Sequence, residues 1–145
     1  MLGDPLLSLG ASSPRDIFPG WNDYVDRLEK NWRKLITPQD TIVLAGDISW
    51  AMRLTETLKD FAFLQQLPGQ KIILKGIHDY WWSTANKMNA YLKAEGFDTL
   101  HILHNNSYSV EGYAICGTRG WLFDVGEPHD EKVMTREIGR LRMSL

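Results

Sequence analysis

The sequence has a single cysteine, Cys116, among its 145 residues. One cysteine cannot form an internal disulfide, and such chains are typical of reducing compartments. No apolar run approaches the roughly 20 residues that a membrane-spanning helix needs. The N-terminus also has no basic stretch followed by an apolar one, which is the pattern of a signal peptide. We therefore expect a cytoplasmic protein with no membrane partner.

The chain also has no surplus of positive charge. Its 16 basic and 18 acidic residues give a net charge of −2 and an isoelectric point near 6.1. Because nucleic-acid-binding domains carry a basic footprint, we expect no nucleic-acid partner. Hydrophobic residues make up 43% of the chain, which suffices for a packed core. The length corresponds to one domain or most of one, residues 1–145.

Hydrophobic periodicity predicts an alternation of helices and buried strands in the first two thirds of the chain. Residues 5–20 are expected to form a loop because proline and glycine interrupt them. Helices are predicted over 21–36, 54–67 and 83–96, and buried strands over 42–45 and 72–74. Strands that alternate with helices favour an α/β fold with a parallel sheet.

The pattern changes after residue 98. Three short β-like runs are predicted at 99–103, 107–110 and 113–116, with Glu111 and Gly112 as a tight hairpin turn. A last helical pattern runs from Pro128 to Leu145, and no glycine, asparagine or proline closes it. We therefore expect added antiparallel strands and a chain that stops within a helix, as a fragment does. Cys116 is expected to be a buried, inert thiol.

Polar residues follow the two predicted buried strands at the point where each ends. Asp47 comes after Gly46, and His78 and Asp79 come shortly after Gly76. Ligands of open α/β sheets bind beyond the carboxyl ends of the strands, and glycine allows the sharp turn there. The pattern thus indicates a functional site at this edge. The alternative is that both aspartates only cap the helices that follow.

Several segments carry a resemblance to a known family. They are LAGDISWAM (44–52), ILKGIHDYWW (73–82), GDPLLSLG (3–10), NNSYSV (105–110) and YAICGTRGW (113–121). Together they resemble the N-terminal portion of calcineurin-like metallophosphoesterases, in particular a bacterial subgroup. The resemblance implies a layered α/β/β/α sandwich, truncated at the C-terminus, and a metal-dependent phosphoester hydrolase.

The same resemblance implies roles for individual residues. Asp47 would bridge two divalent metal ions (Mn, Fe or Zn), and Asp4 would bind the first of them. His78 would lie near the leaving group of a phosphoester substrate, with Asp79 orienting its imidazole. Arg119 is a candidate to contact a phosphate oxygen; a structural salt bridge is the equal alternative.

Two positions depart from the family pattern. Leu6 and Ile77 stand where the family places a histidine and an asparagine that bind metal, and neither hydrocarbon side chain can do so. These departures leave open a chain that binds no metal ions. The second hypothesis is therefore a non-catalytic fragment or pseudoenzyme that binds phosphate or a partner. Surfaces left exposed by truncation would favour self-association.

Overall fold

The computed structural model describes residues 1–10, 20–121 and 128–145. The chain divides into two compact units, Met1–Ile102 and Leu103–Leu145. No helix among the described residues is long and apolar enough to cross a membrane.

The first unit is built on a parallel sheet of three strands, β1 (Thr41–Leu44), β2 (Gln70–Ile73) and β3 (Leu100–Ile102). They lie in the order β1-β2-β3, so β2 is paired on both edges. The N-terminal segment runs parallel to β1 and its following loop, with bridges from Leu2 to Leu44 and from Leu7 to Ser49. The predicted α/β class with a parallel sheet is confirmed. The run at 99–103, expected among the added antiparallel strands, is instead the parallel strand β3, because the preceding helix returns the chain to the same end of the sheet.

Three helices of this unit match the predicted ones: α1 (Tyr24–Leu35), α2 (Leu58–Gln66) and α3 (Ala85–Ala94). A 3-10 turn, η2 (Leu54–Thr57), leads into α2. The helix expected from residue 21 begins at Tyr24 because Asp23 has a left-handed backbone with φ of 52°. The core combines apolar side chains of the sheet, the helices and the loops between them, among them Leu44, Ile73, Phe61, Leu64, Trp81 and Met88.

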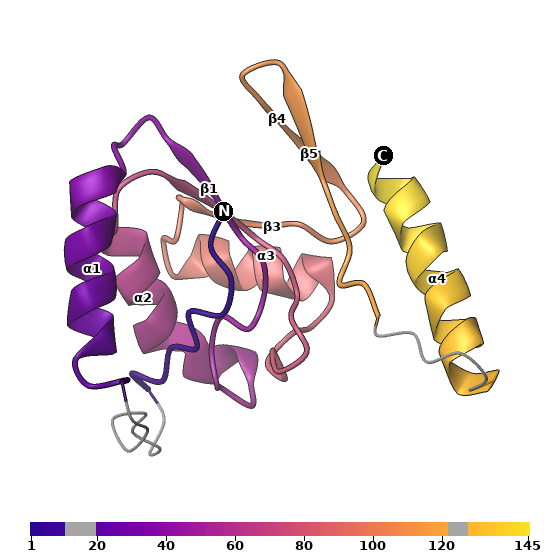
Figure 1. The fold of residues 1–145 in the computed structure, drawn as a ribbon, viewed down its shortest axis with the longest axis horizontal. Coiled ribbons are helices and arrows are strands. Elements are labelled where there is room, and N and C mark those ends of the chain that lie inside the picture. The colour runs from indigo at the N-terminus through magenta and orange to yellow at the C-terminus, as the bar shows by residue number, and fades with distance from the viewer. Residues whose placement is uncertain (11–19, 122–127) are drawn as a thin grey trace. The chain divides into compact units, whose positions relative to one another are not determined.

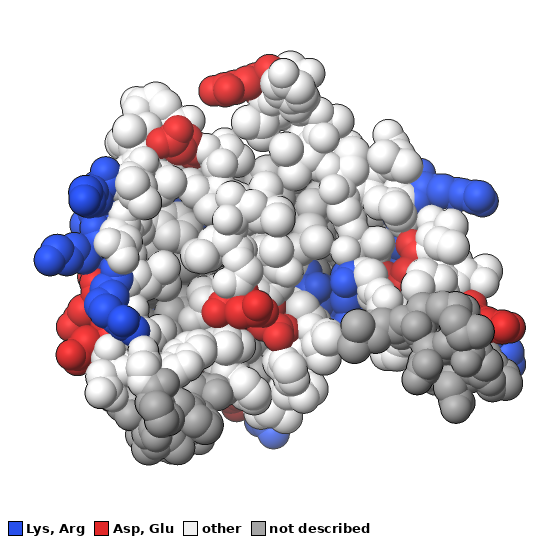
Figure 2. All heavy atoms as spheres, in the orientation of Figure 1, with Lys and Arg blue, Asp and Glu red and all other residues white. Residues whose placement is uncertain are grey.

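Helices α1 and α2 lie side by side in Figure 1, and Arg33 of α1 donates a hydrogen bond to the Gln66 carbonyl at 3.4 Å. Figure 2 shows basic and acidic side chains together over α1. One such pair, Arg33 and Glu29, has an N–O distance of 2.8 Å, but both side chains are substantially exposed. Solvent screens exposed pairs, so this face is a solvated surface that contributes little to stability.

The sheet contains a buried lysine, Lys71 on β2, which is fully buried. Its ammonium group donates hydrogen bonds to the Leu67 carbonyl and, at 3.2 Å, to the Thr99 hydroxyl. Burial lowers the pKa of Lys71 from its ordinary value of 10.5 to about 8, and the negative charge of Asp98 offsets part of that shift. The charged amine therefore lowers the stability of the folded state near neutral pH.

This burial predicts a stability that rises with pH. Between about pH 8 and 10.5 Lys71 is neutral in the folded chain and charged in the unfolded one, so the unfolded state binds more protons. The free energy of unfolding should rise across that window by an amount on the order of 3 kcal/mol. Urea unfolding at about pH 7.5 and about pH 10.5 measures it. In Lys71→Met the free energy of unfolding should no longer rise with pH. An equal rise in that variant would mean that other titrating groups cause it.

The second unit contains an antiparallel hairpin and a helix. Strands β4 (Ser107–Val110) and β5 (Tyr113–Cys116) pair with Val110 opposite Tyr113. Glu111 and Gly112 have φ of 51° and 83°, as both central residues of a type I′ turn require, so the predicted hairpin is confirmed. Helix α4 spans Pro128–Ser144. Cys116 is half-buried, and the expectation of a buried thiol is wrong because a two-stranded ribbon covers little of its own surface.

Candidate active site

Two loops meet at the carboxyl ends of β1 and β2. A Cβ atom on Gly46 would lie 2.5 Å from the Cα atom of Gly76, so the two backbones touch. Gly46 also has φ of +107°, a conformation that side chains disfavour. The glycines thus allow the close approach that the sequence pattern predicted, and the residues after them come together.

Asp47 and His78 form the centre of this meeting point. The Asp47 carboxylate accepts a hydrogen bond from the His78 backbone N–H at 2.7 Å, and its second oxygen lies 2.8 Å from His78 Nδ1. The Asp47 side chain is 13% exposed and that of His78 is 43% exposed. An ionised carboxylate can only accept, so Nδ1 carries a proton and Nε2 is the ring nitrogen that can exchange one. The predicted proximity of these residues is confirmed.

Asp79 is fully buried and connects the two loops. One carboxylate oxygen accepts from the backbone N–H groups of Asp47 and Gly76, at 2.9 and 2.8 Å. The other accepts from the Ile48 N–H at 2.8 Å, the Trp81 indole at 2.9 Å and, more weakly, the Ser49 N–H at 3.4 Å. Burial raises the pKa of Asp79, and these donors offset part of the rise.

The predicted role of Asp79 as the group that orients the His78 imidazole is wrong. Asp47 makes that contact, while the hydrogen bonds of Asp79 go to backbone N–H groups and to Trp81. The reason is geometric. Asp79 follows His78 directly, and its side chain points into the core beneath the loops rather than toward the ring.

Aromatic side chains flank the His78 ring. Trp50 stacks with it at a centroid distance of 5.5 Å and an interplanar angle of 23°. Tyr80, which is 54% exposed, meets it edge-on at 6.2 Å. Trp81, by contrast, is buried against Phe61. The sequence alone did not identify Trp50 as a site residue. A tryptophan three residues after an aspartate has no pattern that distinguishes a binding-site side chain from a core side chain.

The N-terminal segment brings Asp4 to the same edge. The Asp4 N–H donates to the Gly46 carbonyl at 3.2 Å, and the Leu6 N–H donates to the Asp47 carbonyl at 3.0 Å. Asp4 and Leu6 both have positive φ, 50° and 47°. Asp4 is exposed, and its predicted position near Asp47 is confirmed.

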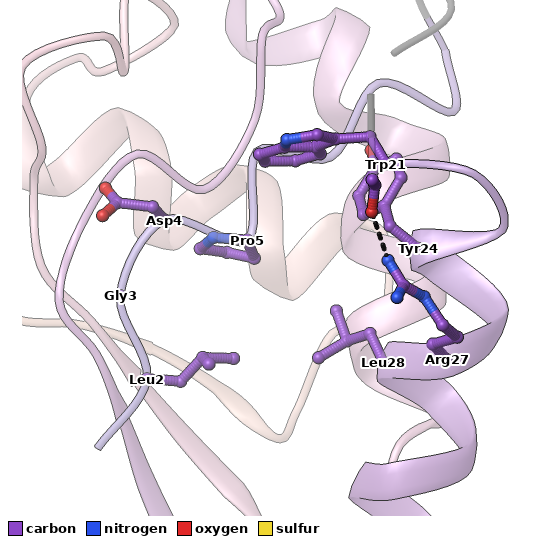
Figure 3. Close-up of a pocket in the computed structure, with 9 residues that line it drawn as sticks. Leu2, Gly3, Asp4, Pro5, Trp21, Tyr24, Arg27 and Leu28 are labelled. Atoms are coloured by element: carbon purple, nitrogen blue, oxygen red, sulfur yellow. Dashed lines mark hydrogen bonds between the residues drawn. The ribbon is translucent and has the colours of Figure 1, made fainter. Parts of the chain in front are cut away.

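A cavity of about 240 Å³ lies between this segment and α1. Figure 3 shows Leu2, Pro5, Trp21 and Leu28 around it, while the Asp4 carboxylate points away from Pro5 and Trp21. Neither Asp47 nor His78 lines this cavity. It is therefore a mainly apolar recess beside the candidate site, separate from the polar pair.

A second buried carboxylate anchors this region from α2. Asp60 is 2% exposed and accepts hydrogen bonds from the Leu9 N–H at 2.7 Å and from the Ser49 hydroxyl. Burial raises the pKa of Asp60, and its hydrogen bonds offset part of the rise. Asp60 thus ties the N-terminal segment to the loop after β1. The sequence did not predict this role for Asp60, because a single aspartate on a helix is typical of a solvent-exposed face.

The described residues do not fit a centre for two metal ions. Nowhere in the described ranges do three or more histidine, cysteine, aspartate or glutamate side chains gather closely enough to hold an ion. Ile77 is 53% exposed and Leu6 is half-buried, and neither offers a donor atom. Both carboxylate oxygens of Asp47 already contact His78.

Arg119 belongs to the second unit, Leu103–Leu145. Its guanidinium carbon lies 4.9 Å from the centroid of the Trp121 ring, a cation–π contact. The predicted contact of Arg119 with a phosphate oxygen stays a prediction.

No protein-family model and no curated protein matches the chain. Among solved structures, the chain is similar to a protein of unknown function from Aquifex aeolicus, with 25% sequence identity and a TM-score of 0.44. The match covers 86% of this chain and 61% of that one, so the chain spans about three fifths of the length of that protein. The likeness assigns neither a family nor an activity.

Proposed function

We propose that the chain carries the phosphoester site of a metal-dependent phosphoester hydrolase and that its own residues leave that site catalytically impaired. The observation that carries this proposal is the contact of Asp47 with His78, at the meeting ends of two parallel strands. The finer fold, a layered calcineurin-like sandwich, is part of the same proposal.

The chemistry assigned to the chain rests on the His78 imidazole. Asp47 holds the proton on Nδ1, so Nε2 is left to donate a hydrogen bond to a phosphate oxygen when the ring is protonated. Such a donor stabilises charge on the phosphate or protonates the leaving oxygen, which is worth about 10²–10⁴-fold in rate when it is well placed. Trp50 and Tyr80 limit the movement of the ring from two sides.

Phosphoester hydrolysis by this family also needs two metal ions to generate a hydroxide and clamp the phosphate. Asp4 and Asp47 are the two carboxylates proposed for them, and Leu6 and Ile77 supply nothing further. This shortage favours the second candidate function, a pseudoenzyme that binds a phosphate group or a partner without cleaving it. We also propose that Arg119 contacts a phosphate oxygen.

The unmodified chain is expected to show negligible cleavage of chromogenic aryl phosphate monoesters and diesters, with or without added Mn²⁺. Leu6→His with Ile77→Asn should not restore cleavage, because two ions need more ligands than four residues provide. Release of the chromophore measures the rate. Robust Mn²⁺-dependent turnover by the unmodified chain, abolished by Asp47→Asn, would contradict the proposed shortage of metal ligands.

Binding of inorganic phosphate tests the site without requiring turnover. Amide NMR signals of Gly76, Ile77 and His78 should shift on titration, and His78→Ala should weaken binding about tenfold, the worth of one charge-assisted hydrogen bond. His101→Ala is the matched control, because His101 lies on β3 and contacts Gln70 at 2.7 Å. Shifts spread over the surface, equal in both variants, would rule out a phosphate site at His78.

A further inference from the structure

Helix α4 packs against its own unit through polar side chains. Glu137 is 3% exposed and Ser144 is 1% exposed. The Thr118 hydroxyl donates to Glu137 at 2.6 Å, and the Gly117 N–H donates to the Ser144 hydroxyl at 3.0 Å. This polar face, with Val133 as its buried apolar member, joins α4 to the segment that follows β5.

The apolar side chains of α4 lie on a different face. Their spacing of four, three and four residues places them in one line along the helix. Ile138 is 46% exposed, Leu141 38% and Leu145 82%, and the Leu145 N–H continues the helix by donating to the Leu141 carbonyl at 3.0 Å. We call this set the α4 stripe: Met134, Ile138, Leu141 and Leu145. Stripes of this kind are normally buried in soluble proteins.

Charges of opposite sign flank the α4 stripe on one edge. Glu131 lies at the N-terminal end of this edge and Arg142 at its C-terminal end, and both are exposed. They lie seven and four residues from Ile138, so both belong to the helix face next to the stripe. When two copies of this edge lie side by side in opposite directions, the acid of each copy lies opposite the base of the other.

We propose that the α4 stripe is the contact surface for a second copy of this chain, in an antiparallel helix pair. A two-fold axis across the helix places the same edge of both copies together with opposite directions. Glu131 then faces Arg142 of the partner subunit, and Arg142 faces the partner's Glu131. This self-complementarity is the reason to favour a second copy over an unrelated partner.

The apolar positions agree with this arrangement. Glu131 and Arg142 are centred near residue 137, and so are Met134 and Leu141. If the two helices cross near residue 137, Met134 lies against the partner's Leu141 and Ile138 lies close to the partner's Ile138. Both sets of side chains therefore define one register, within about one residue, or about 1.5 Å along the helix. The proposal is independent of the phosphoester site.

Light scattering after size exclusion tests the pairing over a wide range of concentrations of the whole chain. The wild type should shift from 16.6 kDa toward about twice that mass as concentration rises. Ile138→Glu should weaken the dimer by about a hundredfold or more, since it places a charge at the centre of the contact. Met143→Glu is the matched control, because Met143 is 70% exposed on the opposite face and should leave the mass unchanged.

Charge exchange tests the antiparallel direction. Glu131→Arg or Arg142→Glu alone should weaken the dimer about tenfold by bringing like charges together, and the double exchange should restore it. In a parallel helix pair, Glu131 of one copy lies far from Arg142 of the other, so the double exchange would not restore the dimer. That result would overturn the proposal. A wild type that stays at 16.6 kDa at every concentration also overturns it, and leaves the stripe to another occupant.

Discussion

Asp79→Asn is expected to destabilise the fold by at least about 3 kcal/mol, although it changes only one atom type in the side chain. Each oxygen of Asp79 accepts at least two hydrogen bonds, from Asp47 and Gly76 on one side and from Ile48 and Trp81 on the other. An amide turned either way places an NH₂ group against two donors. Buried donors without an acceptor cost about 1–3 kcal/mol each, and the low dielectric of the core increases the repulsion.

Urea unfolding followed by tryptophan fluorescence measures this effect. Asp26→Asn is the matched control, since Asp26 is exposed on α1 and its replacement should change stability by less than about 0.5 kcal/mol. Asp79→Ala should be destabilising as well, because it leaves the same donors without any acceptor. If Asp79→Asn and the wild type unfold at the same urea concentration, Asp79 does not hold the two loops together.

Gly76→Ala is expected to destabilise the fold by about 1–3 kcal/mol or more and to break the contact between Asp47 and His78. A Cβ atom at Gly76 would lie 2.0 Å from a carboxylate oxygen of Asp47 and 2.1 Å from its backbone nitrogen. These distances are far inside van der Waals contact, and the Asp47 backbone N–H is also fixed by its hydrogen bond to Asp79 at 2.9 Å. The added methyl group therefore opposes the geometry that places the candidate site.

Gly139→Ala should have the opposite effect on stability. Gly139 lies within α4, and a Cβ atom there would meet no heavy atom within 4 Å. Alanine at such a position should stabilise the helix by about 1 kcal/mol. Thermal unfolding gives both values, and the ¹⁵N shifts of the His78 ring report whether Nδ1 still carries its proton. A Gly76→Ala variant as stable as wild type, with unchanged ring shifts, would contradict the close approach of the two loops.

The sequence predicted local structure well where a local cause decides it. Apolar runs predicted β1 and β2, helical periodicity predicted α1 to α4, and Glu111 with Gly112 predicted the hairpin turn. The two glycine-containing strand ends also predicted that Asp47 and His78 meet. All these features depend on residues close in sequence, or on the rule that neighbouring parallel strands end at one edge.

Tertiary structure alone decided which carboxylate contacts which partner. Asp47 and Asp79 follow strands in similar patterns, yet one contacts the imidazole and the other is buried beneath both loops. Asp60 and Lys71 are likewise buried through contacts with residues far away in the chain or on other elements. The periodicity of α4 predicted its helix but not its packing, because which face a helix buries depends on the surface it meets. Side-chain patterns determine secondary structure locally, whereas desolvation and hydrogen bonding of a charged group depend on everything that surrounds it.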